Sequence, residues 1–498
     1  MYTRSVTPLF PPFLGFSMAS LARSSLLQIS GKLLGIFFGL ATFYLLLHFF
    51  GTEGYGVFTT ALTYVTFFSI VVDFGLTITT AQMIAEKGAD EQKILSNLFA
   101  LRIVSALAFM MLAPLSAWFL PGTEKVFPLI CIGSATYFFG AIAQMFLGVF
   151  QKRLELATPV IAEMLSRALS LAGILFVGLT TQSLLHATFA FTLGAAVQLV
   201  IMLFATHRRI PLRLSWDFSV WKNILSRSWP IGLSIFFNLL YLKGDVLFLW
   251  GLGKSDWEIG QYGAAYKVVD ILTMVPVTFM GLVLPLLTLA WTSQDRGGFT
   301  RRMQQTIDLF AVISIPCIFG AWALGVPLMT AVKPDLALAG QLLWVLVPAA
   351  VVVFFGSLFG HAVVALQAQR PMTWNYCIVA VLGVAGYLLL VPPFGAWGAA
   401  WVTLFCEAAI ALLAYVVIRK RWKASLSFLI PLKALVASVV MFFALELVQY
   451  FFAPFSPVSS LLLSFAIGVL VYFLALSAVQ GPTLRDAKKL LAADARQS

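Results

Sequence analysis

Ten ionisable residues stand out in this 498-residue sequence because they lie inside long apolar runs. Charged residues make up only 10% of the chain, whereas 61% of its residues are hydrophobic. An ionisable side chain at such a position is costly unless it faces water, a partner or a ligand, so each one is a functional candidate. The bases are Lys32, Arg102, Arg167, Lys243 and Lys267, and the acids are Asp73, Glu163, Asp245, Asp270 and Glu407.

The five bases indicate phosphate binding. A lysine ammonium attracts phosphate as a compact charge, and an arginine guanidinium offers a planar fork of donors that fits phosphate oxygens. Lys32, Arg102 and Lys243 have no acid at helical spacing to neutralise them. We therefore predict that these three side chains face a water-filled cavity that binds an anionic group.

The other two bases have acidic neighbours. Glu163 precedes Arg167 by four residues and Lys267 precedes Asp270 by three, so each pair lies on one face of a helix. Each pair could line the cavity, or its two members could simply neutralise each other. The sequence leaves both interpretations open.

The acids also have two possible roles. Asp73 could bind a coupling proton or sodium ion, or it could orient Lys32 or Arg102, and the sequence does not decide between these roles. Asp245 and Glu407 lie near the middle of their apolar runs, where they could act in either way.

Other kinds of site find little support. The four cysteines and four histidines form no pair at metal-ligand spacing. Gly251–Ser255 resembles the end of a phosphate-binding loop, but Phe248 stands where that motif needs glycine. The net charge of +12 comes mainly from short basic gaps between apolar runs rather than from a solvated basic surface. We therefore expect no metal, no cofactor and no nucleic-acid partner.

The apolar runs must position these residues. A mean hydropathy of +0.96 is far above that of a soluble domain, so the bilayer must be the solvent. Each run is longer than the roughly 9–11 residues of a membrane barrel strand, and lipid admits only helices and closed barrels. We predict an all-α, polytopic membrane protein with about fourteen transmembrane helices, over residues 26–50, 56–85, 94–120, 127–150, 156–179, 183–206, 230–250, 259–290, 306–332, 338–366, 372–392, 396–418, 432–452 and 457–478.

Basic residues orient these spans. Of the 32 lysines and arginines, six lie in spans or at their ends, 23 fall in segments predicted inside, and only Lys125, Lys254 and Lys333 fall outside. Cytoplasmic loops of membrane proteins carry such an excess. We therefore predict a multi-pass bacterial inner-membrane protein with both termini in the cytoplasm.

The longest polar interruption divides the chain into two blocks of six spans. We predict a cytoplasmic N-terminal leader, an N-lobe, a cytoplasmic linker, a C-lobe, an additional helix pair and a cytoplasmic tail, at residues 1–23, 24–206, 207–229, 230–423, 424–478 and 479–498 respectively.

The two blocks are weakly alike. Gly56–Ala61 and Gly260–Ala265 open the second span of each block with glycine, an aromatic residue and alanine at matching places. This similarity suggests a duplication, with the lobes related by an axis along the membrane normal. Close helix packing at small residues is the alternative explanation.

Short motifs along spans one to twelve resemble, in order and spacing, the polysaccharide-exporter branch of the multidrug/oligosaccharidyl-lipid/polysaccharide (MOP) exporter superfamily. They are Leu33–Gly35, Phe50–Gly56, Val72–Leu76, Trp229–Leu233, Tyr241–Asp245, Gly260–Lys267, Pro285 and Gly395–Ala400.

The resemblance implies an O-antigen-type flippase. Such a protein passes an undecaprenyl-diphosphate-linked oligosaccharide, the unit of an O-antigen, capsule or exopolysaccharide, from the cytoplasmic to the periplasmic leaflet by alternating access. The implied partners are this substrate, membrane lipid, a coupling proton or sodium ion, and the polysaccharide polymerase machinery. In fourteen-span relatives that flip lipid II, the additional helix pair forms a groove for the lipid tail.

Two alternatives stay open. An ion-coupled small-molecule exporter of the multidrug type shares the two-lobe plan. A membrane glycan polymerase or ligase would generally need a large outside loop, whereas the longest predicted outside loop has roughly eight residues. We therefore expect a transporter and not an enzyme.

Overall fold

The computed structural model describes residues 18–479, except 87, 89, 154 and 453–456. Every regular element within these residues is an α-helix, and none of them forms a strand. Most of the predicted leader and nearly all of the predicted tail lie outside the described residues. The prediction of an all-α membrane protein is confirmed, because twelve of the described helices are long and apolar enough to span a bilayer.

The helices follow the predicted apolar runs. Each of the fourteen runs falls on a helix, with α8 at the seventh run and parts of two runs joined in α1. In chain order the helices are α1 (Met18–Asp73), α2 (Leu76–Ala85), α3 (Glu91–Trp118), α4 (Phe127–Met145), α5 (Leu147–Arg153), α6 (Ala157–Thr180), α7 (Leu184–His207), α8 (Phe218–Gly251), α9 (Asp256–Thr292), α10 (Arg296–Val332), α11 (Ala337–Ala365), α12 (Gln369–Phe394), α13 (Ala396–Arg421), α14 (Leu429–Phe452) and α15 (Pro457–Ala478).

Helix α1 is a hairpin of two spans. Gly51 has φ 72° and ψ 177°, a conformation that residues with a side chain rarely adopt, and the chain turns there. The ring centroids of Phe43 and Tyr55 consequently lie only 5.3 Å apart, whereas twelve residues of straight helix would cover about 18 Å. The first two spans therefore pack against each other directly.

The second predicted span, 56–85, is interrupted. Helix α1 ends at Asp73, and Phe74 and Gly75 have φ values of 33° and 76° before α2 begins. The expectation of one continuous span is wrong here, because two successive positive φ values break the hydrogen-bond ladder of the helix. The break leaves backbone carbonyl groups without helical partners inside the bundle.

The guanidinium of Arg102 on α3 satisfies this break. It donates to the carbonyl oxygens of Val72 and Ala141 at 2.9 and 3.2 Å. It also donates to the Asp73 carboxylate at 2.5 Å and to the Thr77 hydroxyl at 3.0 Å. The side chain is only 1% exposed. Because lipid offers no donors to a broken helix, Arg102 supplies the ones that the interrupted backbone lacks.

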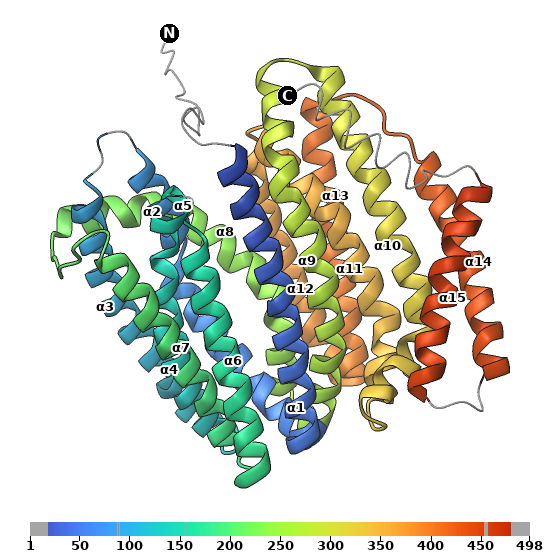
Figure 1. Cartoon of the computed structure of the whole chain (residues 1–498), viewed down its shortest axis with the longest axis horizontal. Coiled ribbons are helices and arrows are strands. Elements are labelled where there is room, and N and C mark those ends of the chain that lie inside the picture. Colours follow the sequence, from blue (N-terminus) through green and yellow to red (C-terminus); the bar gives the residue numbers. More distant parts are fainter. Residues whose placement is uncertain (1–17, 87, 89, 154, 453–456, 480–498) are drawn as a thin grey trace.

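The helices form two groups and an additional pair (Figure 1). In the first group, α6 packs on α1 and α7, and α4 packs on α3 and α7. In the second, α11 packs on α9, α10 and α13, and α12 packs on α8 and α13. The pair α14 and α15 packs on α10 at the edge of the molecule. Contacts between the two groups run mainly through α1, α8 and α9, so these helices position whatever lies between the groups.

The connection between the groups is shorter than the predicted linker, because α8 already begins at Phe218. The preceding segment docks on α3. The Asp217 amide donates to the Asn97 side chain at 2.8 Å, and the Asp217 carboxylate lies 3.0 Å from the Lys93 ammonium. The hydrogen bond from Lys93 lowers the pKa of Asp217. This connection is therefore held against the first group.

At the predicted outer end, the two similar segments of the sequence touch each other. A methyl group on Gly56 would lie 1.8 Å from the carbonyl oxygen of Asp256, and one on Gly260 would lie 2.0 Å from that of Thr52. Each glycine thus meets the backbone four residues before the other. Such a reciprocal contact is what a two-fold axis between duplicated lobes produces.

Polar contacts surround this glycine contact. The Thr52 hydroxyl donates to the Asp335 carboxylate at 2.7 Å. The Lys125 ammonium lies 3.1 Å from Glu53 and 3.5 Å from Asp256, and so joins α1 to α9. The hydrogen bond to Glu53, followed by the charge of Asp256, raises the pKa of Lys125. The two groups are therefore closed against each other at this end.

Replacing Arg102 with alanine should destabilise the folded protein and not only its transport. The change leaves the Val72 carbonyl at the break without its donor and removes the ion-pair partner of Asp73, which keeps only the Thr77 hydroxyl. Leaving one buried polar group unsatisfied costs about 1–3 kcal/mol. We expect a low yield and a lower melting temperature in detergent, with R102K intermediate because lysine cannot reproduce the fork of contacts. An R102A protein as stable as the wild type would show that packing alone holds the break.

Replacing Gly260 with alanine should weaken the predicted outer end, because overpacking of a tight contact costs about 1–3 kcal/mol. Gly281→Ala on the same helix is the matched control, since no atom lies within 4 Å of the added methyl position. We expect a lower melting temperature for G260A than for G281A. Equal melting temperatures would contradict a tight contact between α1 and α9.

Candidate functional site

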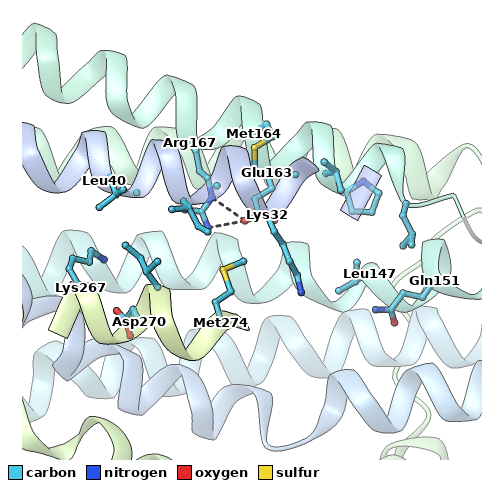
Figure 2. Close-up of a pocket in the computed structure, with 18 residues that line it drawn as sticks. Lys32, Leu40, Leu147, Gln151, Glu163, Met164, Arg167, Lys267, Asp270 and Met274 are labelled. Atoms are coloured by element: carbon cyan, nitrogen blue, oxygen red, sulfur yellow. Dashed lines mark hydrogen bonds and ion pairs between the residues drawn. The ribbon is translucent and has the colours of Figure 1, made fainter. Parts of the chain in front are cut away.

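A cavity of about 400 Å³ lies between α1, α6 and α9 and gathers half of the ten predicted bases and acids. Lys32 comes from the first arm of α1, Glu163 and Arg167 from α6, and Lys267 and Asp270 from α9. Figure 2 shows these five side chains around the cavity, with Lys267 and Asp270 on the strip of α9 that faces it. The packing of α1 between α6 and α9 therefore brings together residues more than 200 positions apart.

The bases of this cavity differ in their partners. The Lys32 ammonium donates to the Thr278 hydroxyl on α9 at 2.9 Å. Arg167 forms the predicted pair with Glu163, donating twice to one carboxylate oxygen, at 2.8 and 3.0 Å. Lys267 has no hydrogen bond or ion pair within the described part of the chain. The cavity therefore holds one cation that no carboxylate or hydroxyl engages.

Asp270 takes a different partner from the one that its spacing allowed. It accepts from the Lys243 ammonium of α8 at 3.0 Å, so the neutralising pair between Lys267 and Asp270 does not form. The Lys243 ammonium also lies 4.4 Å from the centre of the Tyr266 ring, a cation–π contact. Lys243, expected to be unpaired, is thus held beside the cavity by an acid from the neighbouring helix.

A second cavity, of about 930 Å³, adjoins the first and shares Glu163, Arg167 and Lys267 with it. Arg102 and Asp73 lie in its wall. The N–H donors of Arg102 already bind groups at the helix break, so they are not free to bind a phosphate in this structure. Asp73 could bind a coupling ion or orient a base, and in the structure it forms an ion pair with Arg102.

The remaining predicted acids lie elsewhere. Asp245 is buried at 1% exposure, accepts from the Tyr262 hydroxyl at 2.8 Å and lines neither cavity. Glu407 is also buried and absent from both cavity walls. The Tyr262 hydroxyl also shares a hydrogen bond of 3.3 Å with the Thr403 hydroxyl. Thr403 in turn shares a hydrogen bond of 3.4 Å with the Tyr387 hydroxyl. The second group of helices thus has a closed interior network of its own.

Because Asp245 and Glu407 lie outside both cavity walls, the walls carry a net positive charge. Three bases, Lys32, Arg167 and Lys267, line the first cavity against two acids, Glu163 and Asp270, which leaves a formal excess of one positive charge. Lys243, predicted to face the cavity, lines neither wall and only pairs with Asp270 from outside. Arg102 and Asp73 cancel in the wall. The spans as a whole hold about as many acids as bases, so only the fold reveals this local excess.

Uncharged polar residues complete the cavity walls, and a survey of charges alone overlooks them. Thr42 and Thr136 line the second cavity. Gln151 lines the first cavity, and Gln144 and Gln198 line the second. Their signal in the sequence is an amide inside or beside an apolar run, a position where a polar group needs water, a partner or a ligand. No cluster of three metal-ligating side chains occurs among the described residues.

Solved structures of transporters share this fold. The lipid II flippase MurJ, in an inward closed conformation, superposes with a TM-score of 0.76 at 16% identity, over 92% of this chain and 98% of that one. An inward-facing multidrug resistance MATE family transporter of the MOP superfamily gives 0.61 at 14% identity, over 78% and 94%. A MOP superfamily transporter from Pyrococcus furiosus gives 0.58 at 13% identity, over 81% and 96%. At such identities the likeness concerns the fold.

The sequence comparison is more specific. No curated protein sequence matches the chain. The family model described as polysaccharide biosynthesis protein matches residues 21–291, more than half of the chain and all of the first group of helices together with α8 and nearly all of α9. The predicted resemblance is confirmed: this multi-pass membrane protein has the fold of the MOP superfamily transporters and belongs to the polysaccharide biosynthesis protein family.

Proposed function

We propose that this protein flips an oligosaccharide linked to a polyprenyl diphosphate across the membrane by alternating access. The observation that carries the proposal is the formal excess of one positive charge in the walls of the adjoining cavities, where Lys267 has no ion pair among the described residues. A diphosphate that joins a polyprenol to a sugar carries two negative charges at neutral pH. Lys267, which has no partner among the described residues, and Lys32, which holds only a neutral hydroxyl, are the first groups available to it.

The closed end supports the proposed direction of transport. The glycine contact and the ring of polar contacts seal the predicted outer end. We propose that in this state a substrate enters the cavities from the predicted cytoplasmic side. We therefore assign transport from the cytoplasmic to the periplasmic leaflet of the bacterial inner membrane, with both termini in the cytoplasm.

An apolar groove offers a place for the lipid tail. A cavity of about 650 Å³ lies between α9, α10 and α11 on one side and α14 and α15 on the other, and its lining is almost entirely apolar. The Tyr472 hydroxyl donates to the Val312 carbonyl at 2.8 Å, and the Gln449 amide to the Ala323 carbonyl at 3.1 Å. These bonds fix the additional pair to α10, so the groove keeps its shape while the headgroup crosses.

The buried acids of the second group are candidates for ion coupling. Asp245 and Glu407 make no ion pair within the described residues, and a carboxylate at bilayer depth must bind a proton or a cation or be well hydrogen-bonded. We assign to Asp245, bonded to Tyr262 and to the Val246 amide, the binding of the coupling proton or sodium ion.

Removing a cavity charge should slow flipping. We expect K32Q and K267Q each to lower the initial rate about tenfold, because a hydrogen bond to a charged group contributes about 1.5–3 kcal/mol. The measurement uses proteoliposomes that contain a fluorescent polyprenyl-diphosphate sugar, with an external quencher that reports the outer-leaflet fraction. Lys222→Gln, an exposed lysine at the start of α8, is the matched control and should keep the wild-type rate.

Two results would contradict the proposal. Wild-type rates for both K32Q and K267Q would remove the cations from substrate binding. A wild-type protein that moves cationic dyes but no diphosphate lipid would favour the small-molecule exporter.

Filling the apolar groove should also block lipid flipping. Gly320 lines the groove, and no atom lies within 4 Å of an added Cβ, so a larger side chain can start there without a clash at its first atom. We expect Gly320→Phe to reduce the flipping rate at least severalfold, while Gly281→Phe, also in open space but outside the groove, has little effect. Equal rates for the two variants, both with normal melting temperatures, would show that the tail does not use this groove.

A further inference from the structure

The second cavity belongs almost entirely to the first group of helices. Its described walls come from α1, α2, α3, α4, α5, α6 and α7, and among the other described residues only Ile235 and Lys267 line it. It is therefore a chamber inside one lobe, open at Lys267 to the cavity that holds the cations. At about 930 Å³, it is more than twice as large as that cavity.

Neutral polar groups line this chamber. The amides of Gln144 and Gln198 and the hydroxyl of Thr42 make no hydrogen bond within the described part of the chain, although all three lie on membrane-spanning helices. An amide side chain offers both donors and an acceptor. At bilayer depth such groups are retained when water or a ligand satisfies them.

Two aromatic rings in the same wall are held in place. The Tyr137 hydroxyl shares a hydrogen bond of 2.6 Å with Thr66, and the ring centroid of Phe191 lies 5.3 Å from that of Phe58. Fixed rings beside free amides and hydroxyls suit a ligand with alternating hydroxyl groups and C–H faces. A sugar ring is such a ligand, whereas a diphosphate is not.

The central tyrosines of the second lobe are not free in this way. Tyr262 and Tyr387 are fully buried there, and their hydroxyls are used in the network with Asp245 and Thr403. The two lobes share a plan, yet among the described residues the first has free amides beside a cavity, whereas the central tyrosine hydroxyls of the second are bonded to Asp245 and Thr403.

We infer that the chamber in the first lobe is a glycan-binding site, which takes the oligosaccharide of the substrate and selects it through Gln144 and Gln198. This inference rests on the proposed function and deepens it. The diphosphate then lies at Lys267, where the two cavities meet, and the sugars extend from it toward α4 and α7. A volume near the upper limit of small-molecule sites suits several sugar rings rather than one.

The test compares two lipids in proteoliposomes, a fluorescent polyprenyl diphosphate with one sugar and the same lipid with a pentasaccharide. For the double variant Gln144→Ala and Gln198→Ala, we expect the pentasaccharide rate to fall about tenfold, as two lost neutral hydrogen bonds would produce. The one-sugar rate should stay within about twofold of the wild type. Gln341→Ala, on α11 and in neither cavity wall, is the matched control.

A steric variant makes the test independent of the amides. Gly140 lies in the chamber wall with no atom within 4 Å of an added Cβ, so Gly140→Phe fills the chamber without a direct clash. We expect it to stop the pentasaccharide and spare the single sugar, whereas Gly281→Phe spares both.

The outcomes separate the inference from the function on which it rests. Equal losses for both lipids, or no loss for either, would overturn the glycan site. If K267Q still slows both lipids in that case, the flippase proposal stands without the chamber. A wild-type protein that moves neither lipid would remove both proposals, and one that moves only the single sugar would overturn the chamber.

Discussion

The interior of this protein is organised by one constraint, namely that a polar group at bilayer depth must find a partner inside the molecule. The break after Asp73 shows the constraint in its simplest form. Two residues with positive φ open the helix, and the guanidinium of Arg102 then binds the groups that the break exposes. Because Arg102 is paired with Asp73, the wall of the larger cavity near the break carries no net charge. The remaining cations can then act at the junction of the two cavities.

Helix α9 connects the parts of the proposed mechanism. Its beginning carries Gly260 and Asp256, which close the predicted outer end against α1. Its middle carries Lys267 and Asp270 on the cavity side, and the adjacent Val268 lies in the apolar groove. A movement of this single helix relative to α1 therefore changes the outer contact, the cation cavity and the groove together. Such coupling is what alternating access requires.

The sequence alone predicted the helices well because lipid leaves so few options for a long apolar run. It also predicted the pair of Glu163 and Arg167, since four residues along a helix is a local relationship. It could not predict that Asp270 pairs with Lys243 or that Arg102 binds the carbonyl of Val72, because these contacts depend on how distant helices pack. The interruption at Phe74 was also missed. Glycine inside an apolar run is common at helix contacts, and its presence alone does not show a break.

The contact between Gly56 and Gly260 has a further consequence for the rate of opening. Glycines that meet bare backbone interlock no side chains, so the two surfaces can part without any rotamer change. The resistance to parting then comes from the surrounding polar contacts, chiefly Lys125 with Glu53 and Asp256. Lys125 and Glu53 are largely exposed, at 67% and 64%, and dissolved salt screens attraction between exposed charges. A rise in the ionic strength of the compartment that it faces should therefore shorten the lifetime of the closed outer end.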